Sequence, residues 1–274
     1  MTPASPPLLV YHHLPRTGGT SLLAVILGNY ASAEVVRVYG GVGAGGVAGD
    51  SVDSYRDWYR SLPAGTAVRC VASHSANLLM PTLERPFRAL CLLRDPTERV
   101  WSLYHALRRL GHREGELTPA VETGREILRR GWTVADIYRE LAAGKPADSH
   151  LHEQFQVFFD DQTRRILAPW RDTSELGYSP DAKLTTAGLR DFAIEVLDRH
   201  YVVGTKERYR SSLERFAAAF AWTRLDAERV DRGVGRRPLD PETRALILAH
   251  NQLDVELHAH FSGTNEPGLV SQTE

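Results

Sequence analysis

Five short apolar runs recur along the chain, and most lack the alternation of apolar and polar positions typical of a half-exposed strand. They are rich in valine and leucine, as expected of strands covered on both faces of a parallel sheet. The runs span residues 8–14, 35–40, 67–73, 87–94 and 201–205. We therefore predict about five β-strands, mainly parallel.

Helical periodicity follows several of these runs. Patterns of helical spacing begin at Thr20, Pro96 and Ser212, after the first, fourth and fifth runs. Strands that alternate with helices predict an α/β fold with a doubly wound sheet flanked by helices. Ligands of such sheets bind beyond the carboxyl ends of the strands, so the loops that follow the strands are the expected place for a site.

The middle of the chain, about 116–168, is helical by periodicity and contains no strand pattern. We predict a helical insertion packed beside the sheet, within a single domain that spans residues 1–274. The length of 274 residues is near the upper limit for one domain. The glycine-dense stretch 40–50 should be flexible. An alternative interpretation is that it forms a lid over a site.

The charge balance limits the possible partners. With 33 basic and 34 acidic residues, the chain has no overall field that would favour nucleic acid or an anionic membrane. Cys70 and Cys91 each lie in an apolar run, which indicates buried, reduced thiols. No run approaches the ~20 apolar residues of a membrane helix, and no signal peptide is evident, so we expect a soluble cytoplasmic protein.

The stretch YHHLPRTGGTSLL, residues 11–23, has the composition of an anion-binding loop. A strand is followed by Gly18 and Gly19, and Thr20 and Ser21 then open a helix, so that backbone N–H groups and the helix dipole point at one spot. Such a spot favours phosphate. The alternative is that the glycines only form a turn and Thr20 only caps the helix.

This loop differs from the nucleoside triphosphate loop of kinases. A Walker A sequence has a lysine just before its final Ser or Thr, whereas here Gly19 precedes Thr20 and the loop's cation is Arg16. The fourth strand ends in Arg94, at the position where a nucleoside triphosphate site would be expected to have an acidic residue that helps to hold magnesium. A nucleotide with two separate phosphate groups and no metal therefore fits best, and the spacing of His250, His258 and His260 lacks a helical zinc motif.

A second anion site is predicted at the end of the fourth strand. Asp95 can cap the next helix, Pro96 suits its first position, and Glu98 completes a capping-box pair. None of these roles explains Arg94, which a phosphate would bind in a bidentate manner. Ser102 could add a hydroxyl to the same group, or could be a small residue at a close helix contact.

Together, HLPRTGGTSL and LLRDPTERVWSLYH resemble the two cofactor-binding signatures of carbohydrate sulfotransferases that use 3′-phosphoadenosine 5′-phosphosulfate, including the heparan-type O-sulfotransferases and their bacterial relatives. The resemblance implies a P-loop-like sheet, a first motif around the 5′-phosphosulfate and a second motif on the 3′-phosphate. The residues carried over are Arg16, Thr17, Gly18, Gly19, Thr20 and Ser21 for the first motif, and Arg94 and Ser102 for the second. The family normally has lysine where Arg16 stands, and weaker similarity continues in 159–167, 202–214 and 232–243.

His74, directly after the third strand, is the predicted catalytic base. A neutral imidazole there would accept the proton of the acceptor hydroxyl, and the resemblance implies the same role. His12, His13 and His105 are weaker candidates. The late basic residues Arg232, Arg236 and Arg237 either close over the 3′-phosphate, as the resemblance implies, or form a solvated loop.

The sequence thus predicts an enzyme that transfers a sulfuryl group from 3′-phosphoadenosine 5′-phosphosulfate to a hydroxyl, or an amine, of a carbohydrate or small metabolite, without a metal. Arg16 and the loop amides would stabilise the leaving phosphate, and His74 would act as base. A nucleotide-dependent kinase and a catalytically silent nucleotide-binding protein remain as alternatives. The sequence identifies neither the acceptor nor the oligomeric state.

Overall fold

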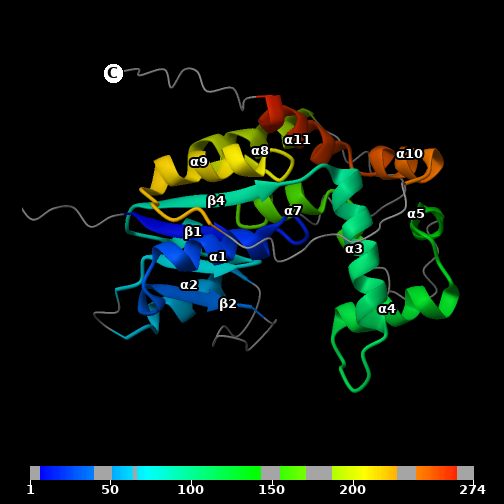
Figure 1. Ribbon diagram of the computed structural model, residues 1–274, viewed down its shortest axis with the longest axis horizontal. Helices are drawn as coiled ribbons and strands as arrows, with labels where there is room; N and C mark the ends of the chain where they lie inside the picture. Colours follow the sequence, from blue (N-terminus) through cyan, green and yellow to red (C-terminus); the bar gives the residue numbers. More distant parts are fainter. Residues whose placement is uncertain are drawn as a thin grey trace, which may run out of the picture.

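A parallel sheet of five strands forms the centre of the protein (Figure 1). The structure is a computed structural model that describes residues 7–39, 51–63, 67–142, 155–170, 187–226 and 239–263. The strands are β1 (Leu8–His12), β2 (Val35–Val38), β3 (Cys70–Ser73), β4 (Phe87–Leu93) and β5 (Tyr201–Thr205). The prediction of an α/β fold with a parallel five-stranded sheet is confirmed, with strands up to three residues shorter than the apolar runs.

The order of the strands in the sheet is β2-β3-β1-β4-β5. From the central strand β1 the chain crosses to β2 at one edge, and from β4 it continues to β5 at the other edge. The loops after β1 and β4 therefore diverge from two neighbouring strands, which is the topological switch point where α/β sheets bind their ligands. Strand order thus brings the two predicted motifs to one place.

Successive strand residues point to opposite faces of the sheet, so each face carries apolar side chains. A layer of helices covers each face. Leu9 and Tyr11 of β1 belong to one apolar core, whereas Leu8 and Val10 belong to the other. The first face is covered by α1 (Gly19–Asn29) and α9 (Tyr209–Phe220). The second is covered by α2 (Val52–Arg60), the 3-10 helix η3 (Ala76–Thr82), α7 (Asp161–Leu167), α8 (Ala187–His200) and α11 (Gln252–Gly263). All residues of β1, β3 and β5 are buried, as the Val- and Leu-rich strands predict, whereas the edge strand β2 is partly exposed.

A third apolar core lies beyond the carboxyl ends of the strands, at the right of Figure 1. Its elements are α3 (Pro96–Gly111), α4 (Pro119–Arg130), α5 (Val134–Ala142), the 3-10 helix η4 (Gln156–Phe158) and α10 (Pro241–Ala249). The helical character of the predicted insertion is confirmed in its described part, although α7 packs on the sheet. Within the predicted helical middle, residues 155–159 differ from the prediction, because they contain only the short η4 in place of a longer helix. A single domain stays a prediction.

Side chains of α9 protect the outer edge of β5. Ser212 Oγ accepts from the Thr205 N–H at 2.9 Å and donates to the Thr205 carbonyl at 3.0 Å, and Arg215 donates to the Val203 carbonyl at 3.0 Å. Such caps occupy backbone groups that an added strand would otherwise pair with.

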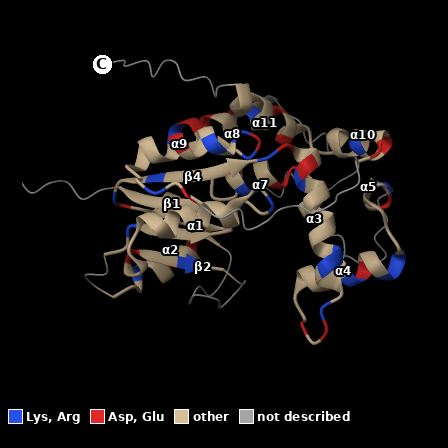
Figure 2. Cartoon of the chain, in the orientation of Figure 1, with Lys and Arg blue, Asp and Glu red and all other residues tan. Residues whose placement is uncertain are grey.

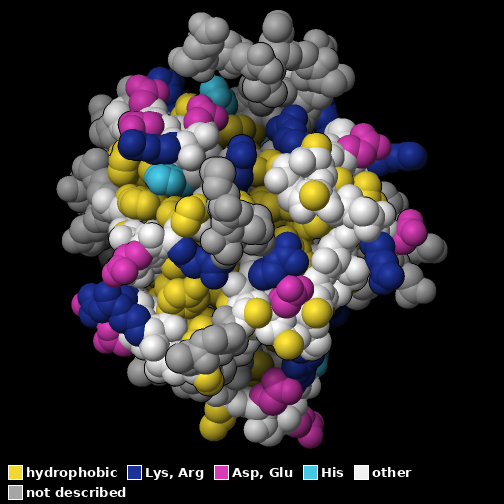
Figure 3. Space-filling view, turned by 90° about the vertical axis from the view of Figure 1, so that its left-hand side faces the viewer, with side chains coloured by type: hydrophobic (Ala, Val, Ile, Leu, Met, Phe, Trp, Pro, Cys, Tyr) yellow, Lys and Arg dark blue, Asp and Glu magenta, His cyan; other side chains and the backbone are white. Residues whose placement is uncertain are grey.

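Basic and acidic residues are intermixed over the part of the chain that the structure describes. Basic and acidic segments alternate over the helices in Figure 2, and Figure 3, which looks onto the amino ends of the strands, shows both signs among apolar side chains. Cys70 and Cys91 are buried and unbonded, as predicted. Within the described ranges, no helix combines the length and the apolar character that crossing a membrane requires.

Candidate functional site

The loop after β1 is held in an unusual backbone conformation. Arg16 has φ 68° and Gly18 has φ 97°. Residues other than glycine rarely adopt this left-handed region of the backbone. The Thr17 hydroxyl donates to the Leu14 carbonyl at 2.9 Å and ties the loop to its own start. Thr17, predicted to contact the cofactor, is therefore buried and engaged within the loop.

The helix after this loop begins with its amide groups uncapped. The alternative role of Thr20 as N-cap is wrong, because α1 begins at Gly19 and Gly18 is its N-cap. Within the described chain, no side chain makes a capping hydrogen bond there, and the first turn contains no acidic residue. Thr20 is exposed and Ser21 is half-buried. The start of α1 thus keeps its positive electrostatic character, which an anion would complement.

Gly19 is required by close packing. A Cβ built on Gly19 would lie 2.0 Å from Cδ2 of His13 and 2.5 Å from the hydroxyl of Tyr11. The Tyr11 hydroxyl also donates to the Gly19 carbonyl at 2.8 Å. The first helical residue is therefore pressed against two side chains from the end of β1.

The two predicted motifs meet at Arg94. Its side chain is buried, and Nη1 donates to the Arg16 carbonyl at 2.9 Å while Nη2 donates to Glu98 at 3.1 Å. Nε and Nη2 of Arg16 in turn lie 3.2 and 3.1 Å from the Ser102 hydroxyl oxygen. The structure thus brings Arg16, Arg94 and Ser102 together, and the Arg16 guanidinium points to Ser102.

The capping pair before α3 differs from the prediction in one partner. Asp95 is the N-cap and accepts from the Glu98 N–H at 3.0 Å, and Pro96 lies in the first turn, as expected. The Asp95 N–H, however, donates to Glu207 at 3.1 Å. Glu98 does not complete the capping box because its carboxylate pairs with Arg94.

A buried polar network fixes the backbone of Arg94. The Gln162 side chain accepts from the Arg94 N–H and donates to the Arg94 carbonyl, both at 2.9 Å. Gln162 is itself held by Asp254 of α11, which lies 3.3 Å from its amide nitrogen. Burial and the neighbouring Asp254 carboxyl raise the pKa of Asp160 in the same network. The segment 159–167 thus anchors the second motif.

His74 lies beside the glycine loop, among aromatic rings. Its Nδ1 is 2.6 Å from the His13 carbonyl, so Nδ1 carries the hydrogen and donates it. In the neutral ring, Nε2 then holds the lone pair that a general base needs. The His74 ring centroid lies 4.6 Å from that of His13 and 5.2 Å from that of Tyr39. Strand register explains this cluster, because His12 of β1 pairs with Ser73 of β3 and the next residues are His13 and His74.

The other three candidate histidines pack against aromatic side chains, as structural residues do. His12 is fully buried, and its Nδ1 lies 3.2 Å from the Tyr201 hydroxyl. His13 stacks on Tyr11 and lies 3.1 Å from the Tyr39 hydroxyl through Nδ1. His105 packs against Trp101 on α3. Of the four candidate histidines, His74 has the placement that suits a base best.

The burial of His13 predicts a pH-dependent stability. Burial, with the nearby His74 and Arg16, lowers the pKa of His13 from 6.5 to about 3. Between these pH values the unfolded chain binds a proton that the folded chain does not. The free energy of unfolding therefore decreases as the pH falls below 6.5. One such proton changes the free energy of unfolding by about 1.4 kcal/mol per pH unit.

Urea unfolding at pH 7.5 and 5.0 measures this effect. His13→Gln should reduce the loss of stability between the two pH values, whereas His112→Gln, at the exposed end of α3, should leave it unchanged. Other buried histidines such as His12 contribute equally to all three proteins. An equal loss in the wild type and in His13→Gln would contradict the prediction.

Two residues at the site were not anticipated from the sequence. Tyr39 directly follows β2 and contacts His13 and His74. Lys206 directly follows β5, and its side-chain carbons lie beside Gly18. Both occupy the first position past a strand, so the rule that ligands bind at the carboxyl ends of strands could have identified them.

Two other predictions fall outside the described residues. Arg232, Arg236 and Arg237, for which closure over the 3′-phosphate and a solvated loop were the two alternatives, lie in residues 227–238, and the glycine-dense stretch 40–50 is likewise not described. Among the residues that are described, no group of three or more His, Cys, Asp or Glu side chains is arranged to hold a metal ion.

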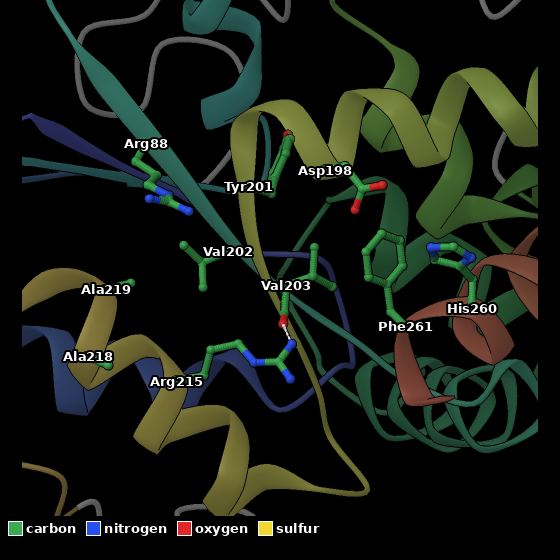
Figure 4. Close-up of a pocket in the computed structure, with 10 residues that line it drawn as sticks. All are labelled: Arg88, Asp198, Tyr201, Val202, Val203, Arg215, Ala218, Ala219, His260 and Phe261. Carbon is green, nitrogen blue, oxygen red and sulfur yellow. Dashed lines mark hydrogen bonds between the residues drawn. The ribbon is translucent and has the colours of Figure 1, made fainter. Parts of the chain in front are cut away.

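A cavity of about 490 Å³ lies away from these loops (Figure 4). It is lined by Arg88 near the amino end of β4, by Tyr201, Val202 and Val203 of β5, and by residues of α8, α9 and α11. The candidate site follows the carboxyl ends of the strands, so this cavity is not part of it.

No family model and no curated protein matches the chain. The assignment of a function therefore depends on the residues of the site and on the motif resemblance alone.

Proposed function

We propose that this protein is a sulfotransferase, which transfers a sulfuryl group from 3′-phosphoadenosine 5′-phosphosulfate to a hydroxyl of a carbohydrate or small metabolite. The observation that carries the proposal is the meeting of Arg16, Arg94 and Ser102, from two distant motifs, beside the uncapped start of α1. One anion would bind at the helix start, and another would bind at Arg94 and at the hydrogen-bonded pair of Arg16 and Ser102. A nucleotide with two separate phosphate groups has this arrangement of charge.

The residues present fit this co-substrate. The Gly18–Gly19 backbone and the first amides of α1 would bind the 5′-phosphosulfate, because they are donors at the positive end of a helix. Arg94 and Ser102 would bind the 3′-phosphate, where a planar guanidinium can donate two parallel hydrogen bonds. Arg16 and Ser102 would then exchange their mutual hydrogen bonds for bonds to phosphate. The strand order and the glycine loop between β1 and α1 support a P-loop-like fold.

His74 would act as general base. Its Nδ1 donates to the His13 carbonyl, which leaves Nε2 to accept the acceptor's proton. The acceptor oxygen bonds to sulfur while the bond between sulfur and the 5′-phosphate oxygen breaks. The electron pair of that bond stays on the phosphate, and the products are a sulfate ester and 3′-phosphoadenosine 5′-phosphate. Preorganised amides and cations would stabilise the charge that develops on the leaving oxygen.

A thermal-shift comparison tests the nucleotide. At a concentration a hundredfold above its Kd, a ligand of the native state adds about 2.7 kcal/mol to the free energy of unfolding, so 3′-phosphoadenosine 5′-phosphate should raise Tm by several degrees. ATP with magnesium should not. The reverse result would replace the proposal by a kinase.

Transfer of labelled sulfate separates an enzyme from a silent binder. The wild type should label at least one member of a panel of hydroxyl and amine acceptors. Nucleotide binding without transfer to any acceptor would favour a silent nucleotide-binding protein.

A further inference from the structure

Strand pairing places Lys206, at the carboxyl end of β5, beside Arg94. Leu93 pairs with Thr205 in the β4–β5 ladder, and the Lys206 N–H donates to the Leu93 carbonyl at 2.8 Å. The next residues along these two strands are Arg94 and Lys206. A lysine and a buried arginine therefore leave the ends of neighbouring strands side by side, next to the switch point between β1 and β4.

The side chain of Lys206 runs along the glycine loop. Its Cγ, Cδ and Cε lie 3.5, 3.5 and 3.6 Å from the position that a Cβ on Gly18 would occupy. Because Cε is as close as Cγ, the whole stem passes beside Gly18. The ammonium, one bond beyond Cε, therefore lies close to Gly18, the N-cap residue of α1.

The acid next to Lys206 is engaged by other partners. Glu207 accepts from the Asp95 N–H at 3.1 Å through one oxygen and lies 3.0 Å from Nε2 of His258 through the other. Both oxygens of its carboxylate are thus used at the start of α3 and on α11. Glu207 holds the loop after β5 in place by these contacts.

Arg16, the cation that the sequence assigned to the leaving phosphate, is directed elsewhere. Two nitrogens of its guanidinium contact Ser102, the residue assigned to the 3′-phosphate. Its carbonyl accepts a hydrogen bond from Arg94. Arg16 therefore belongs to the part of the site predicted to bind the 3′-phosphate.

We propose that Lys206 is the cation that stabilises the leaving 5′-phosphate, and that Arg16 binds at the 3′-phosphate. This inference rests on the proposed function. As the bond between sulfur and the 5′-phosphate oxygen breaks, the electron pair stays on that oxygen, and the Lys206 ammonium beside Gly18 donates a hydrogen bond to it. A charge contact that strengthens as this bond breaks raises kcat more than it raises affinity for the substrate.

The test uses Lys206→Met, which keeps an apolar stem on Gly18 and removes the charge, with Lys206→Arg and Arg16→Met as comparisons. Lys206→Met should lower kcat by about 10²–10³-fold, the effect of losing one donor to a developing anion. Its Kd for 3′-phosphoadenosine 5′-phosphate, measured by calorimetry, should rise less than that of Arg16→Met. Lys206→Arg should recover part of kcat. Arg208→Met, an exposed cation of the same turn, should match the wild type.

Different outcomes contradict the inference and the proposed function. If the wild type transfers sulfate and Lys206→Met has a normal kcat, the assignment of Lys206 is wrong. It is equally wrong if Arg16→Met loses kcat at unchanged nucleotide affinity while Lys206→Met does not. If the wild type neither binds the nucleotide nor transfers sulfate, the proposed function fails.

Discussion

Replacing His74 by alanine should lower kcat for sulfuryl transfer by about 10²–10⁴-fold, the usual contribution of a general base. The Kd for 3′-phosphoadenosine 5′-phosphate should stay near the wild-type value, because the nucleotide is assigned to the loops after β1 and β4. Initial rates with labelled co-substrate and calorimetric titration of the nucleotide measure the two quantities separately.

Controls distinguish a base from a packing role. The His74 ring packs between His13 and Tyr39, so a cavity alone could disturb the loop. His74→Asn keeps a donor for the His13 carbonyl but has no basic nitrogen, and it should be as inactive as His74→Ala. Added imidazole should restore part of the turnover of His74→Ala. An active His74→Asn variant would remove His74 from the proton transfer.

The glycine at the start of α1 should be the most sensitive position of the loop. Gly19→Ala should destabilise the protein by about 1–3 kcal/mol, the usual cost of overpacking, since its Cβ would overlap the ring of His13. That ring has little room to move, because it stacks on Tyr11 and lies against Tyr39 and His74. Nucleotide affinity should fall with it.

Gly28 provides a matched control on the same helix. A Cβ built on Gly28 has no heavy atom within 4 Å, so Gly28→Ala should stabilise the protein by roughly 0.5–1 kcal/mol. The two substitutions should thus change the urea midpoint in opposite directions. The same sign for both would mean that contact with His13 does not determine the requirement for Gly19.

In the two co-substrate motifs, the sequence pattern predicts contacts within one helical turn but not contacts between distant residues. Asp95 as N-cap and Pro96 in the first turn of α3 could be predicted because capping depends on residues within one turn. The true partner of the Asp95 N–H is Glu207, which is distant in the chain. The preference of Glu98 for Arg94 could not be read from the spacing that suggested a capping box.

The role of Arg16 shows the same limit. Its charge and its place in the loop were evident in the sequence, and they favoured the 5′-phosphate. The positive φ of Arg16 and the contact with Ser102 redirect its side chain. Neither follows from the loop alone, because α3 must first pack beside the loop to supply Ser102.

The sequence by itself determined the parallel α/β architecture, the N-cap of α3 and the loops that carry Arg94 and His74. These features follow from apolar runs and turn chemistry, which act over a few residues. Only the tertiary structure decided that Gln162 bonds to the backbone of Arg94, that His74 bonds to the His13 carbonyl and that Lys206 lies along Gly18. Such contacts join residues far apart in the chain, and they depend on the strand order and register through which the whole sheet buries its two faces.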